Sequence, residues 1–475
     1  MVIIYLLGSI AVVLTLFFSR NKQFVFSLLG LFLVWQSWFT LKASTLLGTT
    51  DSVYFTFDSL GILLLVTLTI IAIPAAIHSY IYIENHHEPP RSRSLYLASM
   101  ILLIMAITAG YLSNHIAVTW IFTEITTLSA SALIYHHRNK LALEGTWKYV
   151  FICAISITFI FIGILFLSLS LQQAGSDNLS FSNLLANSKE LNPVWLRMAF
   201  LFIFTGFTAK LGLVPMFTAG IDAKDTAPAP AGALMASVLM NLGFVGIFRF
   251  YVVIANTPLL HWAQLVVGSA AFLSLFVATV YMLKVKNIKR MFAYSGIEHM
   301  GIVMLGIAAG GIGYYAAILH IVLHAFVKSS LFFQYNQLYR VFQSKSITHL
   351  GNYFKYNPTG AIVLLLGFVS SAAMPPSGLF VSEFLIFKSI FDAKQILLLV
   401  VVLLLLTMII WAFGKNIFKV LFVPVEGFDD SQVVKISQWE SLSQYLLLAL
   451  AVYLGLNPPP IFVQLINDSI ILLPH

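Results

Sequence analysis

Long apolar runs alternate with short polar segments over the whole chain of 475 residues. Most runs hold about 18 or more residues, enough to cross roughly 30 Å of hydrocarbon as an α-helix. Barrel strands would be shorter and would alternate in polarity, a pattern that these runs lack. The runs therefore predict an all-α polytopic membrane protein. The predicted spans cover residues 2–18, 24–43, 57–83, 95–112, 115–135, 147–171, 195–218, 229–255, 261–285, 289–308, 312–337, 359–391, 396–418 and 438–456, fourteen in all.

Composition agrees with this class, because 59% of the residues are hydrophobic and only 9% are charged, too few to cover a soluble surface. The net charge of +8 comes from basic residues scattered over short loops, so it indicates topology and a lipid bilayer, not a nucleic-acid partner. Cys153 is the only cysteine, which excludes intramolecular disulfides and cysteine-ligated clusters or zinc sites. The first run has no basic leader, and we interpret it as the first membrane helix instead of a removable signal.

The charges of the loops predict the orientation. Loops after even-numbered spans are acidic, neutral or mixed, and the loops that carry the basic residues named below follow odd-numbered spans. By the positive-inside rule, both termini then lie on the non-cytoplasmic side of a prokaryotic cytoplasmic membrane. The basic residues are Arg20, Lys22, Arg91, Arg93, Arg138, Lys140, Lys148, Lys284, Lys286, Lys289, Arg290, Arg340, Lys345 and Lys355.

Two blocks of five spans have nearly equal length, and each contains one span interrupted by proline, at Val214-Pro215 and at Met374-Pro375-Pro376. Because five is odd, the second block starts from the opposite side of the membrane, as in the inverted repeats of many transporters. The sequence thus predicts broken helices within two inverted repeats. The predicted segments are 1–94 (three spans), 95–255 (first repeat), 261–418 (second repeat) and 419–475 (last helix and tail).

Lys210 is the most informative polar residue, because it stands in the apolar stretch FLFIFTGFTAKLGLVPMF beside the first break. A lysine at mid-membrane costs roughly 2.5–3.5 kcal/mol on insertion scales, so it usually serves a function. Glu124 lies about ten residues into its own span and is the natural partner for an ion pair with Lys210. The alternative is a static pair that only fixes helix packing.

His320, His324 and Lys328 have the spacing i, i+4, i+8, which places them on one face of a helix. Histidine exchanges protons near neutral pH, so two histidines followed by a lysine form a plausible relay. Two histidines at i, i+4 also suggest zinc, but the sequence shows neither an HExxH motif nor a further nearby ligand, and we expect no metal. Histidines bonded to backbone carbonyls are the structural alternative.

Glu383 follows the second break and is the expected counterpart of Lys210, with Lys388 little more than one turn further on. Glu298 and His299 lie a turn or two inside the cytoplasmic boundary, where both a functional role and plain solvation are possible. At the first break stand three more charged residues, for which contact with water is a sufficient explanation: Asp222, Lys224 and Asp225. The loop histidines His86, His87, His136 and His137 suggest no catalysis.

The segments LEGTWKYVFICAISI, IKRMFAYSGIEHMGI, LHIVLHAFVKSSLFF and AMPPSGLFVSEFLI resemble the antiporter-like subunits shared by respiratory complex I, Mrp-type cation/proton antiporters and group 4 hydrogenases. The resemblance covers about residues 57–456 and is strongest to hydrogenase-4 component F and its homologues. It implies a proton path in which Glu124 matches the glutamate of the fifth helix and Lys210 the lysine of the broken seventh. Lys328 matches the lysine that connects the half-channels, and Glu383 the ionisable residue of the broken twelfth helix.

Two departures from the family pattern concern the region after Lys210. The stretch PMFTAGIDAKD keeps Asp222 but lacks both histidines that the family commonly has there. Where many members carry a lysine or histidine in the eighth helix, this chain has Asn241, which cannot titrate and can only hold water in a chain.

The resemblance implies a proton- or cation-translocating membrane subunit of a hydrogenase-4-like or complex I-related redox complex. Such a chain holds no cofactor of its own, and it would assemble with other membrane subunits and, through them, with hydrophilic redox subunits. One alternative is a subunit of a multi-subunit Na⁺/H⁺ antiporter without a redox partner. A second alternative is a non-pumping anchor, which the loss of the titratable group at Asn241 favours.

Overall fold

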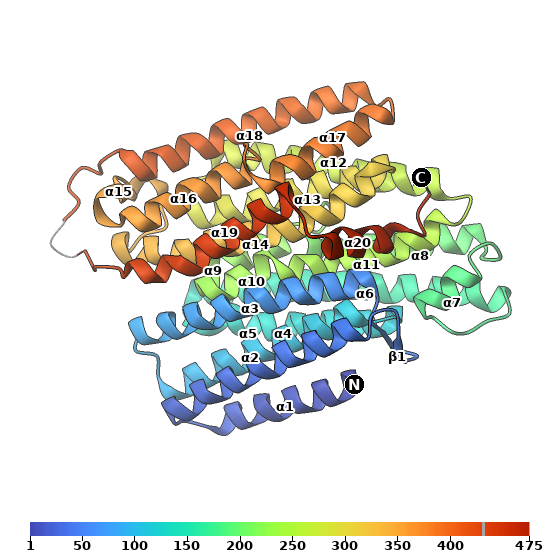
Figure 1. Cartoon of the computed structure of the whole chain (residues 1–475), viewed down its shortest axis with the longest axis horizontal. Coiled ribbons are helices and arrows are strands. Elements are labelled where there is room, and N and C mark those ends of the chain that lie inside the picture. The colour runs from blue at the N-terminus through green and yellow to red at the C-terminus, as the bar shows by residue number, and fades with distance from the viewer. Residues whose placement is uncertain (430–432, 475) are drawn as a thin grey trace. The chain divides into compact units, whose positions relative to one another are not determined.

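The computed structural model describes residues 1–429 and 433–474, and almost every element in it is an α-helix (Figure 1). Residues 430–432 and 475, which belong to the predicted segment 419–475, lie outside the described residues. The helices are α1 (Val2–Phe18), α2 (Lys22–Thr45), α3 (Ser59–Asn85), α4 (Pro90–Leu112), α5 (Ile116–Ile134), α6 (Lys140–Gln173), α7 (Phe181–Ala186), α8 (Pro193–Leu211), α9 (Ala219–Thr226), α10 (Ala229–Ala236), α11 (Val238–Ala255), α12 (Leu260–Lys284), α13 (Ile288–Ala309), α14 (Ile312–Phe342), α15 (Tyr353–Tyr356), α16 (Pro358–Ser371), α17 (Gly378–Asp392), α18 (Ile396–Phe422), α19 (Leu442–Leu456) and α20 (Pro460–Ile470).

The number of spans is confirmed. In the described part of the chain, twelve helical segments are long and apolar enough to cross a membrane, and two shorter apolar helices, α1 and α16, bring the total to the predicted fourteen. Apolar side chains also cover the outer faces of several helices, as at Phe18, Leu41 and Leu397, where a soluble protein would be polar. The chain is therefore a multi-pass membrane protein.

Both predicted breaks are present. The seventh span stops at Leu211, where Gly212 adopts a left-handed conformation (φ 86°), and resumes as α9 at Ala219. Glycine suits this helix end because it has no Cβ to clash. The twelfth span stops at Ser371 and resumes at Gly378, where the Ser377 hydroxyl caps the new helix by accepting from the Leu379 amide. Each break thus joins two helices through a non-helical segment.

The chain folds as two compact units. The first unit contains residues 1–231, 238–266 and 461–475, and the second contains residues 232–237 and 267–460. In the first unit, α8 packs against α6 and α11, and α4 packs against α1 and α5. In the second unit, α14 is the central helix, since it is buried along its length and contacts α13, α16, α17 and α19.

Polar contacts at the helix ends support the alternation of loops within the first unit. At one end, the Arg93 guanidinium donates to the Arg20 carbonyl at 2.8 Å, so the loops after the first and third spans meet. At the other end, Arg249 donates to both carboxylate oxygens of Asp58 at 2.8 and 2.9 Å and to the Tyr111 carbonyl at 2.6 Å. Arginine suits this position because its planar guanidinium binds a carboxylate with several donors.

A few elements were not predicted. The loop after α2 contains a short antiparallel hairpin of β1 (Thr50–Ser52) and β2 (Phe55–Thr56). Four short helices, α7, α9, α15 and α20, lie outside the predicted spans. The eighth span also divides into α10 and α11, and the Val238 carbonyl at this division accepts a hydrogen bond from the Tyr111 hydroxyl at 2.5 Å.

Candidate functional site: buried polar residues of the two units

Lys210 lies in the last turn of α8, just before the break, and is only 5% exposed. Its ammonium donates to the Thr127 hydroxyl of α5 at 2.8 Å and to the Tyr149 hydroxyl of α6 at 3.0 Å. The Tyr149 ring also lies close, with its centroid 5.1 Å from the Lys210 nitrogen. Two hydroxyl groups and an aromatic ring therefore hold this cation inside the first unit.

The expected ion pair between Glu124 and Lys210 is wrong. Among the described residues no ion pair joins them, although they interact electrostatically, and the Glu124 Oε2 atom is buried without a hydrogen bond. The side chain of α5 that binds the Lys210 ammonium is Thr127 instead. It lies one turn after Glu124 on the same helix, and residues three apart share a helix face, so a small rotation decides which of them meets the lysine.

Asn241 lies on α11 and is fully buried. Neither its amide nitrogen nor its amide oxygen makes a hydrogen bond of ordinary geometry, although the Tyr111 hydroxyl interacts with Asn241. Buried polar groups are nearly always satisfied, so an unpartnered amide at this position suits an ordered water molecule. That Asn241 holds water in a proton path stays a prediction.

Asp222 and its neighbours at the first break differ in exposure. Asp222 is partly exposed and pairs with Lys148 at 3.4 Å, and Lys148 also contacts Glu144 at 2.6 Å, so this charge belongs to a surface network. Lys224 and Asp225 are 4% and 5% exposed. Our expectation that contact with water explains all three charges of the break is therefore wrong for these two residues.

The second unit contains a continuous series of buried polar side chains, which we call the polar row. Its members come from four helices: Ser295, Glu298 and His299 on α13, His320 and Lys328 on α14, Ser371 on α16, and Glu383 on α17. All are at most 6% exposed. The row therefore places ionisable groups of separate spans within one network.

Lys328 is the centre of one half of the polar row. Its ammonium donates to the Ser295 hydroxyl at 2.7 Å and to the Ser371 hydroxyl at 3.0 Å. Ser295 lies 3.4 Å from the Glu298 carboxylate, to which its hydroxyl donates. Ser371 also lies 3.1 Å from His299 Nε2, so this one hydroxyl connects the lysine to the histidines.

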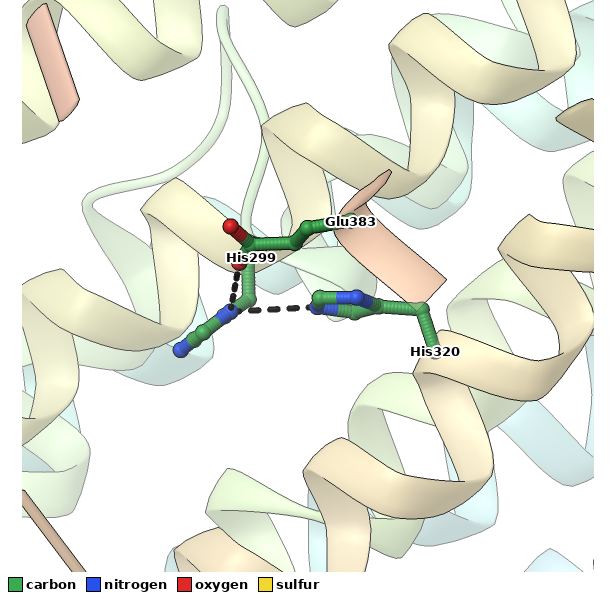
Figure 2. Close-up of side chains that lie close together, drawn as sticks. All are labelled: His299, His320 and Glu383. Atoms are coloured by element: carbon green, nitrogen blue, oxygen red, sulfur yellow. Dashed lines mark hydrogen bonds and ion pairs between the residues drawn. The ribbon is translucent and has the colours of Figure 1, made fainter. Parts of the chain in front are cut away.

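The other half of the polar row is a cluster of His299, His320 and Glu383, which we call the histidine–glutamate cluster (Figure 2). His299 Nδ1 lies 3.1 Å from His320 Nε2 and 3.6 Å from Glu383 Oε1. The second nitrogen of His320 lies 3.0 Å from the Ser382 hydroxyl. Each ring nitrogen of the two histidines thus has a polar neighbour, which is the arrangement of a hydrogen-bonded proton relay.

The histidine–glutamate cluster also has the donor atoms of a metal site, since its three ligand atoms lie within 4.8 Å of one another. Two imidazoles and a carboxylate are a common zinc ligand set. The Lys328 ammonium, however, is linked to His299 through the single hydroxyl of Ser371. A cation in the same network opposes a divalent ion, so the residues fit a proton relay better than a metal.

Three further expectations can be compared with the structure. Glu298 and His299 are 3% and 0% exposed, so plain solvation of these residues at the boundary is wrong. His324 is buried with its ring 5.2 Å from that of His299, beside the polar row. Lys388 is exposed and pairs with Asp392 at 3.3 Å, so it lies outside the row and is not a partner of Glu383.

The sequence did not identify the hydroxyl groups that connect these side chains. Ser295, Ser371 and Ser382 in the second unit, and Thr127 and Tyr149 in the first, all contact a buried lysine or histidine. Serine and threonine are frequent in membrane helices, where they often bond only to the backbone one turn earlier. No pattern in the sequence distinguishes the few hydroxyl groups that bond to a buried lysine or histidine instead.

Residues 113–409 match the model of the family described as NADH:quinone oxidoreductase/Mrp antiporter, transmembrane. The chain belongs to this family. The match spans α5 to α18 and so includes every residue of the polar row as well as Lys210.

Among curated proteins, the hydrogenase-4 component F homolog of Methylacidiphilum infernorum is 28% identical over 429 residues, which cover 88% of this chain and 89% of that protein. Two solved structures share the fold. A chain of the membrane-bound sulfane sulfur reductase, an archaeal respiratory membrane complex, matches with a TM-score of 0.86 at 19% identity, covering 98% of this chain and 96% of that chain. A chain of the Mrp complex of Dietzia sp. DQ12-45-1b matches with 0.84 at 15% identity, covering 99% and 96%.

Proposed function

We propose that this chain is a proton-translocating membrane subunit of a hydrogenase-4-like or related energy-converting redox complex. The observation that carries the proposal is the environment of Lys210 and Lys328, two buried lysines that are each held by two hydroxyl groups. A hydroxyl accepts from an ammonium and donates to an amine, so it stabilises both protonation states of a lysine. Such a lysine can release and regain a proton without losing its partners.

In each unit the proposed path runs through the residues already described. In the first unit the proposed path consists of Glu124, Lys210 and Asn241. In the second unit it consists of the polar row and His324. Oxidation and reduction would occur in hydrophilic partner subunits, since the proposed role of this chain is to move protons only. The relative named hydrogenase-4 component F homolog supports this class of complex.

The test is Lys210→Ala in membrane vesicles that contain the complete complex. We expect redox-driven proton movement to be abolished while the complex still assembles and transfers electrons. The matched control is Lys189→Ala, which removes an exposed lysine of the same unit and should leave proton movement unchanged. Wild-type proton movement in an assembled Lys210→Ala complex would refute the transport role.

A second candidate function is a subunit of a multi-subunit cation/proton antiporter, which the likeness to a chain of an Mrp complex favours. The two candidates differ in their partners. Purification of the intact complex should yield nickel–iron and ferredoxin-like subunits in the first case and only small membrane subunits in the second. If the chain instead anchors partners without pumping, as Asn241 suggests, Lys210→Ala and Lys328→Ala will both leave ion movement unchanged.

The proposed orientation places both termini on the non-cytoplasmic side of a prokaryotic cytoplasmic membrane. The chain suits cysteine labelling, because Cys153 is its only cysteine and is fully buried. Asn85→Cys and Asp177→Cys place a thiol at exposed positions after the third and sixth spans. An impermeant maleimide should label Asp177→Cys from outside and Asn85→Cys only in inverted vesicles. The reverse labelling would contradict the orientation.

A further inference from the structure

Lys224 is a buried lysine that the proposed path does not use. It lies on α9, the second part of the broken seventh span, and is 4% exposed. Its ammonium lies 3.2 Å from the sulfur of Met240. A thioether is a weak acceptor, and among the described residues no carboxylate forms an ion pair with Lys224. Burying a lysine with so poor a partner is costly, and a membrane protein retains such a residue mainly for a function.

The surface position of Asp222 on α9 does not account for the presence of a lysine at position 224. Asp222, two residues earlier, points to the surface network with Lys148. Residues two apart on a helix point in different directions, so Lys224 is turned inward where Asp222 is turned outward. If water or a surface carboxylate stabilised the Lys224 ammonium, the side chain would be exposed or paired, as that of Lys148 is.

The contact with Met240 places Lys224 against α11, one residue from Asn241. The same short stretch of α11 touches the segment of Lys210. A Cβ on Gly243 would lie 2.4 Å from the Leu211 amide nitrogen and 2.9 Å from the Lys210 carbonyl carbon. Residues 240–243 therefore contact Lys224 at one end and the backbone of Lys210 at the other. Within this stretch, both amide atoms of the buried Asn241 lack a hydrogen bond of ordinary geometry.

We infer that Lys224 is a second proton-carrying residue of the first unit, and that water held by Asn241 connects it to Lys210. This inference rests on the proposed function. In each transfer, one N–H bond of an ammonium breaks, the proton passes through the water, and a new N–H bond forms on the amine of the other lysine. No other reactant is needed. Lys224 thereby provides, from α9, the titratable group that α11 lacks at Asn241.

The test compares variants of the complete complex in membrane vesicles, with proton movement measured per electron transferred. We expect Lys224→Met to lower this ratio by about 100-fold, the usual size of an acid–base contribution. Lys148→Met is the matched control, because it removes a nearby lysine from the surface, and it should leave the ratio unchanged. Asn241→His in the Lys224→Met background should restore proton movement, since it returns a titratable group to the path. A purely structural role for Lys224 would not be rescued in this way.

The outcomes separate the inference from the proposed function. If Lys210→Ala stops proton movement and Lys224→Met does not, the proposed function stands and the inference fails. If neither variant has an effect, both fail. Should Lys224→Met not assemble, Lys224→His and Lys224→Gln replace it as the pair to compare. Proton movement with histidine and none with glutamine supports the inference, and equal movement in both overturns it.

Discussion

Ser371 offers the sharpest test of the polar row. Its hydroxyl lies 3.0 Å from the Lys328 ammonium, 3.1 Å from His299 Nε2 and 3.2 Å from the Ser295 hydroxyl, and the residue is 2% exposed. Ser371→Ala removes this bridge between the lysine and the histidines without changing the charge of the network. If the row conducts protons, the variant should slow proton movement while electron transfer between the partner subunits continues.

The magnitude follows from the contacts. A hydrogen bond to a charged group contributes about 1.5–3 kcal/mol, and the transfer step that passes through Ser371 loses a stabilisation of this size. Since about 1.4 kcal/mol corresponds to a tenfold change in rate, proton movement should fall roughly 10- to 100-fold. The same loss should lower the thermal stability of the purified complex, because a buried lysine and a buried histidine each lose a partner.

The assay records the quenching of a pH-sensitive dye in inverted vesicles, normalised to electron transfer and to the amount of assembled complex. Ser370→Ala is the matched control, because Ser370 lies one residue earlier on α16, is similarly buried, and uses its carbonyl, not its hydroxyl, to accept from Ser377. Ser371→Thr keeps the hydroxyl and should retain much of the activity. Wild-type proton movement in Ser371→Ala would refute the reasoning that this hydroxyl connects the two halves of the row.

Three further predictions concern packing, pH and metal binding. Gly243→Ala should lower the melting temperature and proton movement, since its Cβ would overlap the backbone of α8 at a cost of about 1–3 kcal/mol. Gly30→Ala, whose Cβ would meet no atom within 4 Å, should lower neither of them. Burial raises the pKa of Glu88, but the hydrogen bond and charge of His136 outweigh it and hold the pKa below its usual 4.5. The stability that this pair contributes is therefore complete above about pH 4.5 and is lost on further acidification. The melting temperature of Glu88→Gln should fall less than that of the wild type when the pH is lowered through this range. An equal fall in both proteins would contradict a role of the Glu88–His136 pair. Finally, equilibrium dialysis of the purified chain should find no stoichiometric zinc. One equivalent of zinc that the wild type binds and Glu383→Gln loses would establish a metal site at the histidine–glutamate cluster.

Much of the fold could be predicted from the sequence because the bilayer imposes simple rules. A span requires a long apolar run, so the fourteen spans follow from hydrophobicity. Proline marks both breaks, but Pro74 lies inside the continuous helix α3, so proline alone does not specify a break. The short helix α20 and the division between α10 and α11 were not predicted. Neither feature is marked by a change in hydrophobicity along the sequence, so the pattern of apolar runs could not indicate it.

The candidate site was predictable only in part, for a geometric reason. The buried charges stand out in apolar runs, and Lys210, Lys328 and Glu383 were found in this way. Their partners were not, because the rotation of a helix about its axis decides which side chain faces which neighbour, and hydrophobicity does not specify that rotation when most faces are apolar. Glu124 and Thr127 illustrate the difference, since the sequence favoured the carboxylate and the structure places the hydroxyl at Lys210.

Arg249 and the two lysines Lys210 and Lys328 are buried cations whose partners differ in a way that matters for transport. Arg249, at the end of its span, binds the carboxylate of Asp58 directly through short hydrogen bonds. An arginine keeps its proton under all ordinary conditions, so this pair can only hold the helices together. Lys210 instead donates to the neutral hydroxyls of Thr127 and Tyr149 at 2.8 and 3.0 Å, and Lys328 donates to two serine hydroxyls at 2.7 and 3.0 Å. A direct carboxylate partner would fix the proton on the lysine by stabilising the charged form alone, whereas a hydroxyl serves both forms. On our proposal, the Arg249–Asp58 pair fixes the helices, and the hydroxyls at Lys210 and Lys328 stabilise each lysine before and after its proton leaves.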